Sequence, residues 1–270
     1  MARSENKAVR YICLSIFILS AFAMLACEIF KSSLFGDSEF SEMLYSLSSR
    51  FFGIVLCIVL VFYCNFEGIL KLGTYPVLKG ILAVIPCWVI ALNNFPVIPV
   101  MLGQARITSS YCDIFLYAIV CLFVGIFEEL AYRGCVFMLI LKNNRRTRSD
   151  IFRSVVISSA LFGAVHIVNL FAGSGPIPVL LQVGYSFLIG AMCSFVLLKT
   201  GSIWHCALIH AVYNFCGGIV ANYGEGSIWT VPEIALTVVV SILVTAYVFI
   251  AFCKTDPKEA ACLFAVDKMM

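Results

Sequence analysis

The sequence has 270 residues, of which 62% are hydrophobic and 12% are charged, and its formal net charge is +3. A soluble domain carries roughly 25% charged residues, so this chain has more apolar surface than a soluble core can bury and needs lipid around most of it. The small net charge, without basic runs interleaved with aromatic residues, argues against nucleic-acid binding.

Apolar stretches of membrane-spanning length predict eight transmembrane helices. The second and third are the weakest, and the third contains Pro86 and ends in the polar pair Asn93 and Asn94. The sequence therefore predicts an all-α, polytopic integral membrane protein with about eight transmembrane helices around a buried polar site. The predicted spans are 10–29, 51–66, 79–97, 113–141, 154–172, 177–198, 202–221 and 231–253.

The first apolar stretch follows Arg3, Lys7 and Arg10, which is also the pattern of a signal peptide. Because this stretch is long enough to span and further spans follow it, we interpret it as the first transmembrane helix and expect residues 1–27 to be retained.

The basic residues predict the orientation. With the N-terminus in the cytoplasm, 14 of the 18 Lys and Arg residues are cytoplasmic, and the loop 142–153 is the strongest group. Only Lys31, Arg50 and Arg106 then lie outside, and Arg133 lies within a span. We therefore expect a multi-pass protein of the plasma membrane with both termini in the cytoplasm.

The chain has 13 cysteines and no CxxC pair. Most cysteines lie inside apolar stretches, so we interpret them as small packing residues rather than as disulfide or metal ligands. Examples are Cys57, Cys64, Cys121, Cys135 and Cys193.

The stretch 113–141 contains Glu128, Glu129 and Arg133, although a charge at the centre of a bilayer helix costs about 2.5–3.5 kcal/mol. Glu129 and Arg133 are four residues apart, so we expect them to pair on one helix face. Glu128 has Tyr132 at that spacing and is left available for chemistry. The alternative is that all three charges form a structural polar network.

Polar residues on two further spans fall at a similar depth. Phe162 and His166 share a face of one helix, and His210 and Asn214 are four residues apart on another. With a rise of about 1.5 Å per residue, Glu128 and His166 each lie roughly 20 Å from the basic ends of their helices, and His210 and Asn214 lie roughly 16 and 22 Å from theirs. Each residue alone fits a structural hydrogen bond, but their common level predicts one site.

A carboxylate and a histidine that share a water molecule can make it nucleophilic, and a second histidine with an asparagine can stabilise an oxyanion. This set suits peptide hydrolysis. Glu128, His166 and His210 also have the chemistry of zinc ligands, although the chain has no HExxH motif.

The residues EELAYR at 128–133, FGAVH at 162–166 and HAVYN at 210–214 match the motifs EExxxR, FxxxH and HxxxN. Over residues 113 to 220 the chain resembles the CPBP family, the CAAX-protease and bacteriocin-processing (Abi) membrane proteins. The resemblance implies a membrane endopeptidase, often described as a metalloprotease, in which Glu128 and His166 activate water and His210 and Asn214 hold the oxyanion. Glu129, Arg133 and Phe162 would support the site. Both a zinc-dependent and a metal-free, glutamate-dependent mechanism stay open.

The resemblance also suggests a division of the chain into N-terminal transmembrane helices (1–112), a catalytic core (113–221) and a last helix with a cytoplasmic tail (222–270). The expected substrate is a membrane-associated peptide or protein, with or without a lipid group, in contact with membrane lipid. Two alternatives stay open. One is a non-catalytic immunity or scaffold protein that regulates a partner. The other is a proton-coupled transporter, which the absence of visible sequence repeats disfavours.

Overall fold

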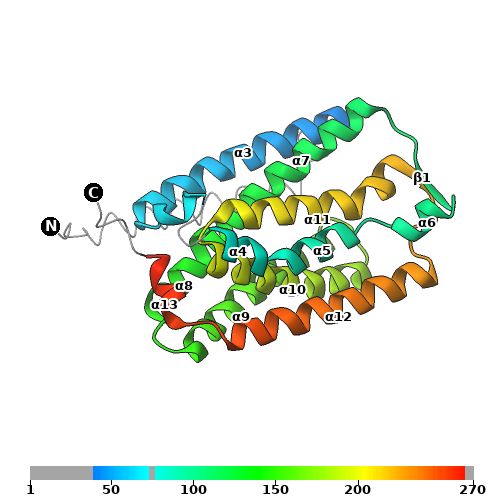
Figure 1. Cartoon of the computed structure of the whole chain (residues 1–270). Helices are drawn as coiled ribbons and strands as arrows, with labels where there is room; N and C mark the ends of the chain where they lie inside the picture. The colour runs from blue at the N-terminus through cyan, green and yellow to red at the C-terminus, as the bar shows by residue number, and fades with distance from the viewer. Residues whose placement is uncertain (1–38, 73–76, 265–270) are drawn as a thin grey trace.

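The computed structural model describes residues 39–72 and 77–264, and these fold into a bundle of helices that run back and forth along one axis (Figure 1). Five of the long helices, α3, α7, α10, α11 and α12, lie side by side, and the chain reverses at the two ends of the bundle. The long helices are α3 (Glu39–Tyr63), α7 (Tyr111–Glu129), α9 (Arg148–Val165), α10 (Pro176–Thr200), α11 (Ile203–Tyr223) and α12 (Val231–Cys253). The shorter helices are η1 (Glu67–Leu70), α4 (Val77–Ala83), α5 (Ile85–Asn93), α6 (Val97–Met101), η2 (Leu130–Phe137), α8 (Met138–Asn143), η3 (His166–Leu170) and α13 (Pro257–Cys262).

Within the described residues, 6 helices are long and apolar enough to cross a membrane. The protein is therefore a multi-pass integral membrane protein, and the predicted all-α class is correct. The predicted count of eight is not confirmed, because the stretch 10–29 lies outside the described residues and the stretch 79–97 is not one long helix. The six candidate spans are Met43–Tyr63, Tyr111–Asn143, Arg148–Leu170, Pro176–Thr200, Ile203–Tyr223 and Val231–Cys253.

The third predicted span is interrupted next to Pro86. Helix α4 ends at Ala83 and α5 begins at Ile85, with Pro86 in its first turn, where a residue without an N–H group is tolerated. The segment still connects the two ends of the bundle. A Cβ atom at Gly80 would lie 2.7 Å from the carbonyl oxygen of Lys199 at one end, and the Ile98 N–H donates to Glu233 at the other.

The second predicted span begins too late in the sequence. Helix α3 starts at Glu39 and its candidate span begins at Met43. Arg50 therefore lies within the span, whereas the sequence predicted it in an outer loop. Residues 39–50 contain no proline or glycine that would stop the backbone hydrogen bonding, so the helix continues through them. The Arg50 guanidinium donates to the hydroxyl of Ser49.

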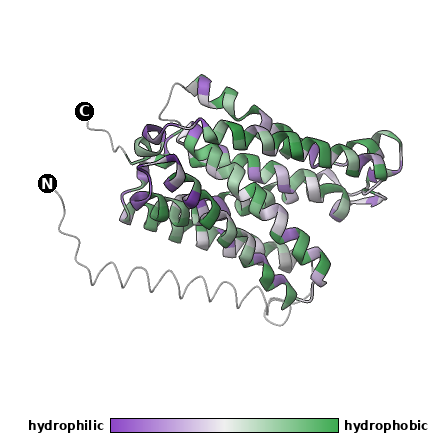
Figure 2. Ribbon diagram, turned by 90° about the horizontal axis from the view of Figure 1, so that it is seen from below, coloured by the Kyte–Doolittle hydropathy of each residue, from purple (hydrophilic) through white to green (hydrophobic). Residues whose placement is uncertain are grey.

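The two ends of the bundle differ in character. Hydrophilic residues gather at the end where the last described residues lie, while the long helices are largely hydrophobic (Figure 2). The predicted basic loop 142–153 lies at this end, where only residues 144–147 connect α8 to α9 and the rest belong to the two helices. At the other end β1 (Ala105–Ile107) pairs antiparallel with β2 (Gly224–Gly226), with Ala105 opposite Gly226.

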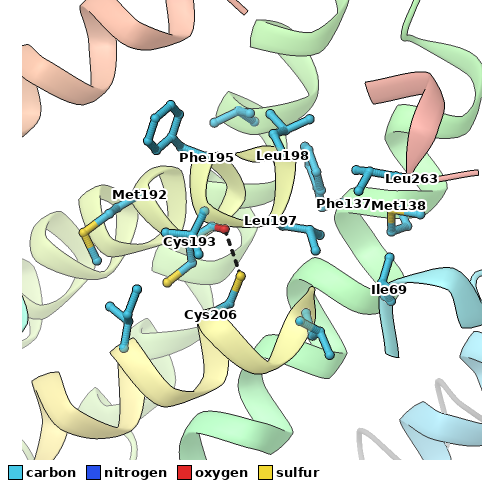
Figure 3. Packing of buried hydrophobic residues seen from close by; sticks show 14 of the residues in the cluster. Ile69, Phe137, Met138, Met192, Cys193, Phe195, Leu197, Leu198, Cys206 and Leu263 are labelled. Atoms are coloured by element: carbon cyan, nitrogen blue, oxygen red, sulfur yellow. Dashed lines mark hydrogen bonds between the residues drawn. The ribbon is translucent and has the colours of Figure 1, made fainter. Parts of the chain in front are cut away.

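A tightly packed core lies between α10, α11 and the segment η2–α8 (Figure 3). Cys193 and Cys206 are fully buried there, and the Cys206 thiol donates to the Cys193 carbonyl oxygen over 3.2 Å. The burial of free thiols at Cys57, Cys121 and Cys135 agrees with the predicted packing role. Because lipid is as apolar as these side chains, dispersion contacts rather than removal from water stabilise this core. The core thus holds α11 at Cys206, which lies one turn before His210 on the same helix.

Candidate active site

The two glutamates lie where α7 passes into a π-helical segment. Helix α7 begins with a capping box between Ser110 and Asp113 and ends at Glu129, and η2, which follows directly, has π-helical geometry. Short π-helical segments inside longer helices occur frequently at functional sites. Arg133 lies within this segment.

Glu129 and Arg133 form the pair that their spacing predicts. Arg133 Nη1 donates to Glu129 Oε1 over 2.9 Å, and the side chains are 1% and 0% exposed. The guanidinium lies over the ring of Phe162 at 4.5 Å, which adds a cation–π contact. A Cβ atom at Gly190 would lie 2.9 Å from Arg133 Nη2, so the missing side chain on α10 makes room for this cation.

His210 lies between the two glutamates. Its Nδ1 is 2.7 Å from Glu129 Oε1, and its Nε2 is 3.5 Å from Glu128 Oε2. A carboxylate accepts hydrogen bonds, so Nδ1 carries a proton and donates to Glu129, while Nε2 faces Glu128. The sequence did not predict the His210–Glu129 contact, because spacing along one helix gives no information about contacts between α7 and α11.

Close packing of small residues brings these helices together. A Cβ atom at Gly125 would lie 2.6 Å from the Ala207 carbonyl oxygen and 3.2 Å from the Ala211 Cβ atom. Small residues of this kind allow the backbones of membrane helices to approach each other closely. Gly125 is one turn from Glu129, and Ala207 and Ala211 flank His210, so this contact sets the spacing of the charged groups.

His166 lies at the end of α9, where the chain continues as the 3₁₀ helix η3. Its Nδ1 is 2.9 Å from the Phe162 carbonyl oxygen. That oxygen can only accept, so Nδ1 carries the proton and Nε2 is the nitrogen left for other partners. The nearby Asn169 instead donates to Gln182 over 2.7 Å.

One cavity of about 190 Å³ brings the predicted residues together. Glu128, Phe162, His166, His210 and Asn214 all line it, whereas Glu129 and Arg133 do not. Glu128 is 22% exposed in contrast to 0% for Glu129, so the two carboxylates have different surroundings, as predicted. The remaining lining residues are Val124, Gln182, Tyr185, Ser186, Ile189 and Tyr213. The contribution of Gln182, Tyr185 and Ser186 from α10 was missed, because no charge or motif identifies them.

Comparison with known proteins covers the same region. Residues 110–216 match the family model described as type II CAAX prenyl endopeptidase Rce1-like. This segment is a domain of that family. It contains all three motifs, which confirms the resemblance found in the sequence. No curated protein and no solved structure matches the chain.

The structure tests whether the predicted zinc ligands are grouped. Among residues 39–72 and 77–264, no three His, Cys, Asp or Glu side chains are grouped closely enough to hold a metal ion. The predicted ligand set of Glu128, His166 and His210 therefore does not fit zinc in this arrangement.

Proposed function

We propose that the protein is an intramembrane endopeptidase that cleaves a membrane-associated peptide or protein, and that Glu128 is its general base. The observation that carries the proposal is the contrast between the two adjacent carboxylates. Glu129 is buried and bonded to Arg133 and His210, while Glu128 lines the cavity opposite two histidines. Membership in a family of CAAX endopeptidases supports the same conclusion.

In the proposed reaction, a water molecule between Glu128 and His166 loses a proton to the Glu128 carboxylate while its oxygen attacks the scissile carbonyl carbon. His166 holds this water through Nε2, because its Nδ1 proton already binds the Phe162 carbonyl. The protonated Glu128 then gives its proton to the leaving amine nitrogen as the C–N bond breaks. This step returns the carboxylate to its starting state.

Asn214 and His210 stabilise the oxyanion in this proposal. The Asn214 amide can donate directly. His210 donates through Nε2 only when both of its ring nitrogens carry a proton, since the Nδ1 proton is directed at Glu129. Glu129, Arg133 and Phe162 support the site by fixing the orientation of the His210 ring, as a carboxylate behind a histidine does in other catalytic sites.

A second, apolar cavity supports a membrane-associated substrate. It has a volume of about 250 Å³, lies between α5, α9, α10 and α12, and shares Tyr185, Ile189 and Tyr213 with the walls of the catalytic cavity. Leu188, Phe152 and Phe249 line it and are 47%, 44% and 55% exposed, so its rim faces the apolar surroundings of the bundle. A substrate held in the bilayer can approach Glu128 from this side.

We assign residues 113–221 as the catalytic core, flanked by helices in 1–112 and 222–270, and place both termini and the loop 142–153 in the cytoplasm. The catalytic residues then lie roughly 20 Å from the cytoplasmic ends of their helices, so cleavage occurs within the membrane. A cysteine introduced at position 146 tests the orientation, because it should react with a membrane-impermeant thiol reagent only after the cells are opened.

The test of the function compares wild-type protein with Glu128→Gln. The amide has nearly the same shape as the carboxylate but cannot accept the proton of the water, and loss of a general base costs about 10²–10⁴-fold in rate. Purified wild-type protein should cleave a membrane-anchored peptide library, and Glu128→Gln should retain the melting temperature without cleaving. Turnover in Glu128→Gln at the wild-type rate would overturn the mechanism, and wild-type protein without hydrolysis would favour an immunity or scaffold role.

A further inference from the structure

Two side chains from neighbouring helices bind the backbone of α11 beside the catalytic pair. The amide of Asn94, directly after α5, donates to the Tyr213 carbonyl oxygen over 2.8 Å. The hydroxyl of Tyr117 on α7 donates to the Asn214 carbonyl oxygen over 3.3 Å. Helix carbonyl oxygens accept the N–H group four residues later, so each side chain uses the second lone pair of an oxygen that already has a partner.

Glycines at 217 and 218 make these contacts possible. A Cβ atom at Gly217 would overlap the Asn94 amide, and one at Gly218 would overlap the Tyr117 hydroxyl. Glycine is unfavourable in a helix interior, so two adjacent glycines in α11 need a structural reason. The two side chains occupy the space that the glycines leave.

The contacts act on the turn that carries the catalytic groups. One bond is to the carbonyl of Asn214 itself and the other is to the residue before it, and His210 lies one turn earlier on α11. Tyr117 belongs to α7, the helix that ends at Glu128 and Glu129. The Tyr117 bond therefore fixes the axial position of Asn214 relative to the helix that carries Glu128. The Asn94 bond fixes the same turn relative to the end of α5.

We infer that Asn94 and Tyr117 are positioning residues, which hold Asn214 and His210 in register with Glu128 through the α11 backbone. This inference rests on the proposed peptidase function. It goes beyond that function because neither residue belongs to the three motifs or lines the catalytic cavity. Asn94 also lies outside residues 110–216, the region that matches the family model.

Asn94→Leu removes the bond to the Tyr213 carbonyl. Tyr117→Phe removes the bond to the Asn214 carbonyl and the weaker one that the hydroxyl accepts from the Asn222 amide over 3.5 Å. Both substitutions remove little volume. The Tyr117 ring packs against Phe215 and Tyr223 at centroid distances of 5.7 and 5.0 Å, contacts that phenylalanine keeps. Asn144→Leu is the matched control. Its amide donates over 3.0 Å to the carbonyl of Ile140 on α8, so it is also a side-chain bond to a helix carbonyl, but it joins residues of one segment and lies away from the site.

We expect Asn94→Leu and Tyr117→Phe to lower kcat about tenfold, a part of the 10²–10³-fold that loss of an oxyanion donor costs. Tyr117→Phe should leave KM unchanged, whereas Asn94 also lines the apolar cavity, so only kcat is compared for Asn94→Leu. Asn144→Leu should leave kcat unchanged.

The same substitutions are then made together with Asn214→Ala. If Asn94 and Tyr117 act through Asn214, their substitution should lower kcat much less in the Asn214→Ala protein, because the effects of substitutions at contacting residues are not additive. An equal loss of kcat with and without Asn214→Ala, or a loss matched by Asn144→Leu, would overturn the inference.

A second measurement does not depend on turnover. A cysteine introduced at position 214 keeps the backbone carbonyl that Tyr117 binds, and its labelling rate by a small thiol reagent reports the position of the turn. Peptide-resolved mass spectrometry gives that rate with Cys112, which is exposed, as the internal standard. Asn94→Leu and Tyr117→Phe should change the rate at position 214 and leave that of Cys112 the same. An unchanged rate at position 214 would refute the inference, whereas wild-type protein without hydrolysis would refute only the proposed function.

Discussion

Helices α11 and α12 follow each other in the chain and both are long enough to span a membrane, but they are held in different ways. In the most apolar stretch of α11, 50% of the residues are buried, compared with 6% in α12. Helix α11 packs against α7 through Gly125, and it receives bonds from Asn94 and Tyr117. The helix that carries His210 and Asn214 is thus fixed along its length.

Helix α12 is fixed at a few points instead. Glu233 accepts the Ile98 N–H over 2.9 Å, and the Tyr247 hydroxyl donates to the Ala83 carbonyl over 2.8 Å. Directly after α12, which ends at Cys253, the Thr255 carbonyl accepts from Arg148 over 3.1 Å. Between these points the apolar cavity separates much of α12 from α10. The comparison suggests that the fold fixes catalytic groups by close packing and keeps space for substrate beside a loosely packed helix.

The largest effect is expected at the buried ion pair. Glu129→Gln leaves the Arg133 cation without its carboxylate, and an unpaired buried charge costs about 3–5 kcal/mol. We expect a lower melting temperature in detergent and poor expression. Arg133→Gln should behave similarly, because it leaves Glu129 without its cation. The double variant should recover part of the loss, since it buries no unpaired charge from this pair. A stable but inactive Glu129→Gln protein would mean that Glu129, and not Glu128, is the base.

A smaller loss is expected where α7 contacts α11. Gly125→Leu places a side chain against the Ala207 carbonyl, and overpacking of this kind costs about 1–3 kcal/mol. Because the helices must separate, the Glu129–His210 bond should lengthen and hydrolysis should fall together with stability. Gly184→Leu is the control, because a Cβ atom there has no neighbour within 4 Å. Equal melting temperatures for the two variants would contradict the role given to Gly125.

The sequence predicted the pairs that lie on one helix and the depth of each polar residue along its own helix. The spacing of four residues was sufficient to pair Glu129 with Arg133, and helix rise placed Glu128, His166, His210 and Asn214 at one level. Contacts between helices were not predicted, because no spacing in the sequence says which faces meet. The His210–Glu129 bond and the lining by Gln182 and Ser186 are examples.

The span predictions failed where backbone geometry differs from hydropathy. Pro86 interrupts an apolar stretch that hydropathy treats as one span, because its ring removes an N–H donor and restricts the backbone. The predicted second span begins directly after Arg50, although helix α3 continues on both sides of this residue. A charge raises the cost of burial but does not end a helix.

The smallest effect is expected on the open side of the molecule, at the cavity beside α12. Ser241 lines this cavity, whereas Val239 on the same helix does not line it and is 54% exposed. Ser241→Trp fills part of the space and should lower kcat/KM for a membrane-anchored peptide about tenfold, which corresponds to about 1.4 kcal/mol. The same peptide without its anchor reaches Glu128 without using this space, so its kcat/KM should stay the same. Val239→Trp adds an equal side chain on the outside and should change neither value. If Ser241→Trp lowered cleavage of both peptides equally, the cavity would affect the packing of the site and not the approach of the substrate.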